Sequence, residues 1–162
     1  MNFKLIDDAI RVCKKHLDDT KTRNTEVENH LAAYLLVLIS AQFELRIEAL
    51  IEAYAARIQD KQIRRFVVDR AKNMTRAPNV GSITGMLAAI SHDGKNAFHK
   101  LCGGQAQSAY NSIIENRHAF VHEAKCNVTI GDLEGYFNDS RGVFSAVVGV
   151  LGLKANEIAH LH

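Results

Sequence analysis

One stretch of sequence decides the fold. From Thr25 to Asp60 it reads TEVENHLAAYLLVLISAQFELRIEALIEAYAARIQD, about 36 residues at helical spacing without proline or glycine. Thr25 with Glu28 forms a capping-box pattern at its start. Apolar residues cover more than one face of the middle, so we expect a central helix of about 54 Å with neighbours packed on several sides.

Helical spacing continues on both sides of this stretch. It predicts further helices over about 5–17, 61–76, 83–90, 105–125 and 129–153, with 93–101 as a continuation of the fourth helix. Ser82 is the expected cap of the helix at 83–90, and the run TIGD at 129–132 is expected to open the last helix. The chain has a single proline, Pro78. These features predict an all-α, up-and-down bundle of five or six helices around one long central helix.

The composition is that of one ordinary globular domain. The chain has 162 residues, 47% of them hydrophobic and 23% charged, so we expect a single domain spanning 1–162. The formal net charge of +2 excludes a strongly basic binder of double-stranded nucleic acid. The three widely spaced cysteines fit reduced thiols, and the N-terminus lacks the apolar run of a signal peptide. Charged residues interrupt 31–51, so we expect a cytoplasmic protein without a membrane span.

The helix expected at 105–125 carries the candidate chemistry. It contains YNSIIENRHAFVHE, from Tyr110 to Glu123. On a helical wheel Arg117 lies at the centre of the apolar arc, where its charge would need a carboxylate partner or a bound anion. The opposite arc is polar and holds Asn111, Glu115, His118, His122 and Lys125. His118 and His122 are one turn apart and are therefore neighbours.

Histidine and arginine together suit metal-free cleavage of RNA. Histidine can move a proton to or from a ribose hydroxyl or a leaving oxygen, and arginine can hold the phosphate as charge builds on it. Arg117 and His122 are about 140° apart on a regular helix, so a second copy across a dimer axis would help to aim both at one phosphate. In the alternative interpretation, Arg117 pairs with a structural glutamate and both histidines are solvated.

A metal site is a weaker alternative. Glu115-x-x-His118 and Glu157-x-x-His160, with Glu44 and Glu48, imitate the ligand set of a di-iron bundle. The second pair lies at the end of the chain, and Glu115 falls on the polar arc, whereas such ligands must point inward. We therefore expect neither a metal nor another cofactor.

Three motifs resemble a known family. They are RHAFVH at 117–122 on a late helix, VTIGDL at 128–133 before the last helix, and AQFELRIE at 41–48 on the long helix. Together they resemble the HEPN domains (higher eukaryotes and prokaryotes nucleotide-binding), whose ribonuclease members carry Arg, four to six residues, then His. The stretch at 41–48 is similar to the subgroup of RiboL-PSP and RNase LS-like domains. The resemblance covers Thr25 to Leu153.

The resemblance implies a role for each matching residue. His122 would transfer protons, Arg117 would bind and orient the phosphate, and Glu44 would be the acidic partner of Arg117. His118 fills the polar second position of the motif and joins the candidate catalytic set. The family also implies a homodimer that needs no metal and leaves 2′,3′-cyclic phosphate and 5′-hydroxyl ends. Such a protein would act as a toxin or anti-phage effector, with an antitoxin or another regulatory protein as partner.

RNA contacts are expected at basic and polar side chains beside the motif and on the segment at 61–76. The candidates are Lys125, Asn111, Arg64 and Arg65, although a basic stripe such as that segment is also typical of a solvated face. Glu123 stands where the family often has glycine, and its charge would weaken phosphate binding. The alternative from another class is a non-catalytic HEPN-like module that binds nucleotide, RNA or protein.

Overall fold

The computed structural model describes residues 2–74, 78–123 and 126–159. It contains the long central helix, α2, which runs Glu26–Ala55. The Thr25 side chain accepts a hydrogen bond from the Val27 amide, and Glu28 accepts one from the Asn24 amide, so both residues of the capping-box pattern act at this end. α2 ends five residues earlier than expected, because the chain turns after Ala55 and Arg64 donates to the Ile58 carbonyl from α3 (Lys61–Met74).

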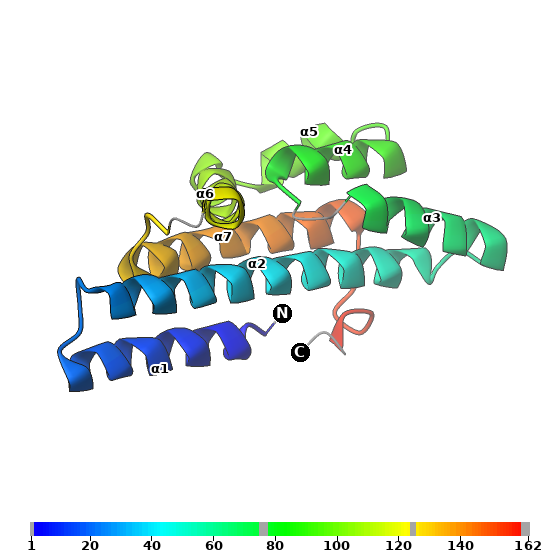
Figure 1. Cartoon of the computed structure of the whole chain (residues 1–162). Coiled ribbons are helices and arrows are strands. Elements are labelled where there is room, and N and C mark those ends of the chain that lie inside the picture. The colour runs from blue at the N-terminus through cyan, green and yellow to red at the C-terminus, as the bar shows by residue number, and fades with distance from the viewer. Residues whose placement is uncertain (1, 75–77, 124–125, 160–162) are drawn as a thin grey trace.

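Four helices pack on α2. They are α3 and, along its length, α1 (Lys4–Thr20), α6 (Gly104–Glu123) and α7 (Ile130–Leu151). Figure 1 shows α1 on one side of α2 and α4, α5 and α6 on the other, with α7 alongside α2. The start of α7 is set by a complete capping box between Thr129 and Asp132, as the TIGD run predicts.

Five aromatic rings join these helices at the centre. They are Phe3, Phe43, Tyr110, Phe137 and Phe144, all buried. The Phe43 ring on α2 stacks on the Tyr110 ring of α6, with centroids 4.8 Å apart and planes at 11°. Phe43 also meets Phe144 of α7 edge-on at 5.0 Å. These contacts seat the first half of α6 on α2 and α7.

The second half of the bundle contains two short helices, α4 (Val80–Ile90) and α5 (Gly94–Leu101). The expected cap at Ser82 is wrong: Asn79 is the cap, and its side chain accepts from the Ser82 amide. α5 does not continue α4, because Ser91 is extended and the chain turns back so tightly that a Cβ on Gly94 would lie 2.2 Å from the Leu87 carbonyl oxygen.

The described residues therefore form seven helices, where the sequence predicted five or six. The difference comes from α4 and α5, which are separate helices rather than one. The all-α bundle itself is confirmed.

The chain beyond α7 is tied to the end of α2. The Arg57 guanidinium pairs with both oxygens of the Glu157 carboxylate, at 2.7 and 2.6 Å, and donates to the carbonyls of Leu151 and Gly152. The same guanidinium, together with the Lys154 amide, lowers the pKa of Glu157 to about 2.

None of the described helices combines the length and the apolar composition that a bilayer span requires. α2 is the longest, and Glu44, Arg46 and Glu48 interrupt its apolar middle.

Candidate nucleic-acid site

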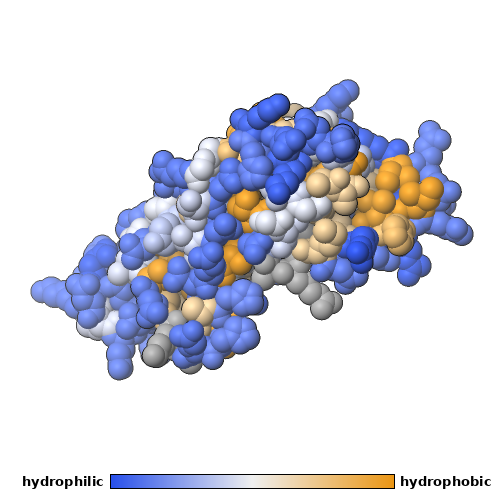
Figure 2. Space-filling view, turned by 90° about the horizontal axis from the view of Figure 1, so that it is seen from above, coloured by the Kyte–Doolittle hydropathy of each residue, from blue (hydrophilic) through white to orange (hydrophobic). Residues whose placement is uncertain are grey.

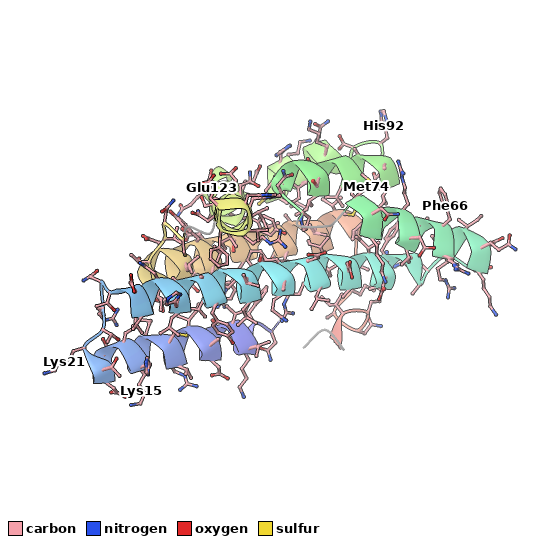
Figure 3. All side chains as sticks on the ribbon, in the orientation of Figure 1. Lys15, Lys21, Phe66, Met74, His92 and Glu123 are labelled. Atoms are coloured by element: carbon pink, nitrogen blue, oxygen red, sulfur yellow. The ribbon has the colours of Figure 1, made fainter. Side chains whose placement is uncertain are left out.

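The candidate site lies where α6 leaves the core. Ala109, Tyr110, Ile113 and Ile114 are buried, whereas Val121, which lies on the same face one to two turns later, is 55% exposed. Figure 3 looks nearly along the axis of α6, with Glu123 labelled at the end that emerges from the bundle. Phe120 still packs against the core, whereas His118, Val121, His122 and Glu123 on the last two turns of α6 are exposed to water.

His118 and His122 form a pair on this end of α6. Both are exposed, and their rings lie parallel, with centroids 5.5 Å apart and planes at 6°. One helical turn separates them, as the i, i+4 spacing predicts. Two imidazoles are thus presented side by side to any ligand that reaches this end of the helix.

Arg117 does not lie where the wheel placed it. Its side chain is half-buried rather than in the core. Among the residues that the structure describes, no hydrogen bond or ion pair holds its guanidinium, and the expected pair with Glu44 is not formed. The guanidinium is available to an anion.

Glu44 instead faces Tyr110, on the inner half of α6. Its charge, after the larger effect of burial, raises the pKa of the Tyr110 hydroxyl. That hydroxyl is buried and has no hydrogen-bond partner within the described ranges. Sequence reasoning placed Tyr110 on the apolar arc and missed its polar atom. The nearest signal was the aromatic-glutamate stretch at 41–48, which supplies both the stacked Phe43 and Glu44.

Asn111 connects α6 to α4 through a hydrogen bond. Its side-chain oxygen accepts a hydrogen bond from the Val80 amide at 2.9 Å, which joins α6 to the first turn of α4. This bond occupies one lone pair of the oxygen, and the amide hydrogens remain for a ligand. Lys125, the other polar residue expected beside the motif, lies outside the described residues.

The candidate RNA-binding arginines of α3 are engaged locally. Arg64 donates from Nε and Nη2 to the Ile58 carbonyl at 2.9 and 2.5 Å. Arg65 lies 3.6 Å from the Asp69 carboxylate, one turn along the same exposed face. Both residues are held by partners on or just before α3, and neither contacts the exposed end of α6 within the described ranges.

The residues considered as ligands of a di-iron site do not form a cluster in the described part of the chain. No group of three or more His, Cys, Asp or Glu side chains there could hold an ion. Glu157 is paired with Arg57, far along the chain from Glu115, and His160 lies outside the described residues.

The all-α bundle is consistent with a HEPN-type domain. The family model for the RiboL-PSP-HEPN matches residues 2–152, and the chain belongs to this family. The match extends the resemblance seen from Thr25 onward to α1. No curated protein and no solved structure gives a significant match. Family membership indicates a ribonuclease or an RNA-binding module.

Proposed function

We propose that the protein is a metal-independent endoribonuclease that leaves 2′,3′-cyclic phosphate and 5′-hydroxyl ends. The observation that carries the proposal is the end of α6, which has two exposed, parallel imidazoles and, within the same turns, a guanidinium without a protein partner among the described residues. Cations without partners at a surface bind anions, and a phosphodiester is the anion that RNA offers.

The reaction needs two proton transfers and one cation. Neutral His122 takes the proton from the ribose 2′-hydroxyl, and the 2′-oxygen attacks the neighbouring phosphorus. The bond from phosphorus to the 5′-oxygen breaks, and protonated His118 returns a proton to that oxygen. Arg117 holds the non-bridging oxygens as negative charge builds on them. Near neutral pH an imidazole can be in either protonation state, so one pair can supply both the base and the acid.

The active assembly in this proposal is a homodimer. α2 exposes an apolar stripe at Tyr34, Val37, Ala41 and Leu45, which are spaced to lie on one face of the helix. Large side chains left on the surface in this way are typical of an interface, and a two-fold axis would bury the stripe of one copy on that of the other. We expect Tyr34→Glu to shift the mass measured by light scattering towards monomer. Val12→Glu, at an equally exposed position on α1, is the matched control and should leave the mass unchanged.

In the cell, the proposed role is that of a toxin or anti-phage effector in the cytoplasm. An antitoxin or another regulatory protein would then restrain the activity. Family membership supports this setting.

The direct test is RNA cleavage in EDTA. Purified protein is incubated with tRNA and single-stranded RNA, and the product ends are analysed for 2′,3′-cyclic phosphate. His122→Ala is expected to lower the cleavage rate by about 10²–10⁴-fold, the usual contribution of a general base. His16→Ala, which removes an exposed histidine from α1, is the control and should cleave like the wild type. Cleavage by His122→Ala at the wild-type rate would refute the proposal.

One observation favours the second candidate, a non-catalytic RNA-binding module. Glu123 follows the motif and is exposed at the end of α6, where its charge opposes that of a phosphate. In this case RNA would be retained without cleavage, and Glu123→Gly would tighten binding while producing no cut ends. A gel-shift assay on the samples of the cleavage test separates the two functions.

A further inference from the structure

A groove of about 170 Å³ lies between α3 and α4. Phe66, Val67, Arg70 and Met74 line it from α3, and Met86 and Ile90 line it from α4. Phe66 is 70% exposed, the largest value among the described large apolar side chains. Figure 2 shows apolar surface at the end of the molecule where α3 lies, and Figure 3 shows Phe66 pointing away from the ribbon.

The pattern of α3 explains why this surface is apolar. Ile63, Phe66, Val67, Arg70 and Met74 follow helical spacing and share one face. α3 packs on α2 through Ala71, its one buried residue. Its contact with α4 is less extensive than its contact with α2. Ile63 and Phe66 have the spacing of residues that face a core, but no described residue covers them. They therefore form an exposed apolar stripe.

One positively charged side chain in the groove, that of Arg70, is available to bind a ligand. Arg70 makes no hydrogen bond or ion pair with the described residues. The neighbouring cations of α3 differ from it, because Arg64 donates to the Ile58 carbonyl, Arg65 pairs with Asp69, and Lys72 pairs with Glu52 at 2.8 Å. The surface therefore offers one guanidinium surrounded by apolar side chains.

We propose that the groove between α3 and α4 binds an amphipathic α-helix of a partner protein that carries a carboxylate opposite Arg70. The apolar face of the partner contacts Phe66, Met74, Met86 and Ile90, and methionine side chains adapt readily to such ligands. From Ile63 to Met74 the stripe rises about 16 Å, which three turns of a bound helix match. This binding does not depend on the proposed ribonuclease activity.

Charge distinguishes this partner from RNA. An RNA strand carries a phosphate at every nucleotide, so a groove that tracks it needs a row of available cations. Only Arg70 meets this condition among the residues that line the groove, and one guanidinium in an apolar surface is complementary to one carboxylate on an apolar helix face.

The test uses a displayed library of 18-residue amphipathic helices with a leucine stripe and polar positions randomised among Glu, Lys and Ala. Selection on the intact protein is expected to enrich sequences with a glutamate flanking the leucine stripe. Against the enriched peptide, Phe66→Ala and Arg70→Glu should each weaken binding at least tenfold by fluorescence anisotropy. Arg65→Glu, a charge reversal on the other face of α3, is the control and should bind like the wild type. Both groove positions lie at the surface, and circular dichroism checks that the variants stay folded.

Three outcomes would overturn the proposal. The first is enrichment without glutamate. The second is binding that is unchanged by Phe66→Ala and Arg70→Glu. The third is displacement of the peptide by single-stranded RNA with a dependence on Arg70, which would assign the groove to nucleic acid. Loss of cleavage by His122→Ala in the separate assay bears on α6 alone and leaves these outcomes unaffected.

Discussion

The two halves of α6 do different work. The first half, with Ala109, Tyr110 and Ile113, is buried against α2 and α7 and holds the helix in place. The second half carries Arg117, which is half-buried, and His118 and His122, which are exposed. Two turns of one helix therefore separate the residues that stabilise the fold from those proposed to act on RNA. Substitutions in the first half should reduce stability, and substitutions in the second half should reduce activity alone.

The largest stability effect is expected at the contact that holds the first half. Phe43→Ala removes the ring stacked on Tyr110 and leaves a cavity among buried aromatic rings. The free energy of unfolding should fall by about 3–5 kcal/mol, measured by urea denaturation. Tyr34→Ala, on the exposed face of the same helix, should change it by less than about 0.5 kcal/mol in the monomer. A loss at Phe43 no larger than at Tyr34 would contradict the division of α6.

The sharpest test of the second half is Arg117→Ala. A buried pair with Glu44 would have made this change cost a few kcal/mol of stability, but the pair is not formed within the described structure. We therefore expect RNA cleavage to fall by about 10²–10³-fold while the free energy of unfolding stays within about 0.5 kcal/mol of wild type. Arg117→Lys keeps the charge without the planar fork and should recover only part of the rate. A melting temperature lowered by many degrees would show that Arg117 belongs to the core after all.

The smallest expected effect is a change in the pH dependence of stability, and it involves Glu157, which lies outside α6. The folded pKa of Glu157, about 2, is below its ordinary value of 4.5, so the clamp with Arg57 stabilises the protein above about pH 4.5. That contribution is lost as the pH falls from 4.5 towards 2, because the carboxylate becomes protonated. Glu157→Gln should be less stable than wild type at pH 6, and the difference should shrink towards pH 2. A difference independent of pH would indicate that the pair contributes through packing rather than charge.

Local signals in the sequence predicted the helices well. Thr129 and Asp132 form the capping box that the TIGD run indicates, because both partners lie within one turn. Ser82 failed as a cap because Asn79, three residues earlier, offers a side-chain oxygen to the Ser82 amide. The separation of α4 from α5 depends on the close approach of Gly94 to Leu87, which is a tertiary contact that no local pattern contains.

The candidate site was predicted in part. The spacing of His118 and His122 placed them together, since neighbours on one helix need no tertiary information. The half-buried position of Arg117 could not be predicted in this way, because a helical wheel treats the whole helix as equally packed, whereas burial decreases towards the end of α6, where Val121 is exposed. A wheel of one helix also contains no information about α2, so it could not place Glu44 near Tyr110.

The aromatic cluster also determines when, during synthesis, parts of the fold can assemble. Phe3 and Phe43 are made before α6, whereas their ring partners Phe137 and Phe144 lie on α7 and are made after it. At about 5–20 residues per second, a ribosome makes Phe137 roughly 7–27 s after Phe3. During that interval α1 and α2 have no α7 to pack against, and the seat of α6 is incomplete. A nascent chain therefore cannot assemble the exposed end of α6 in its final place until α7 has been made.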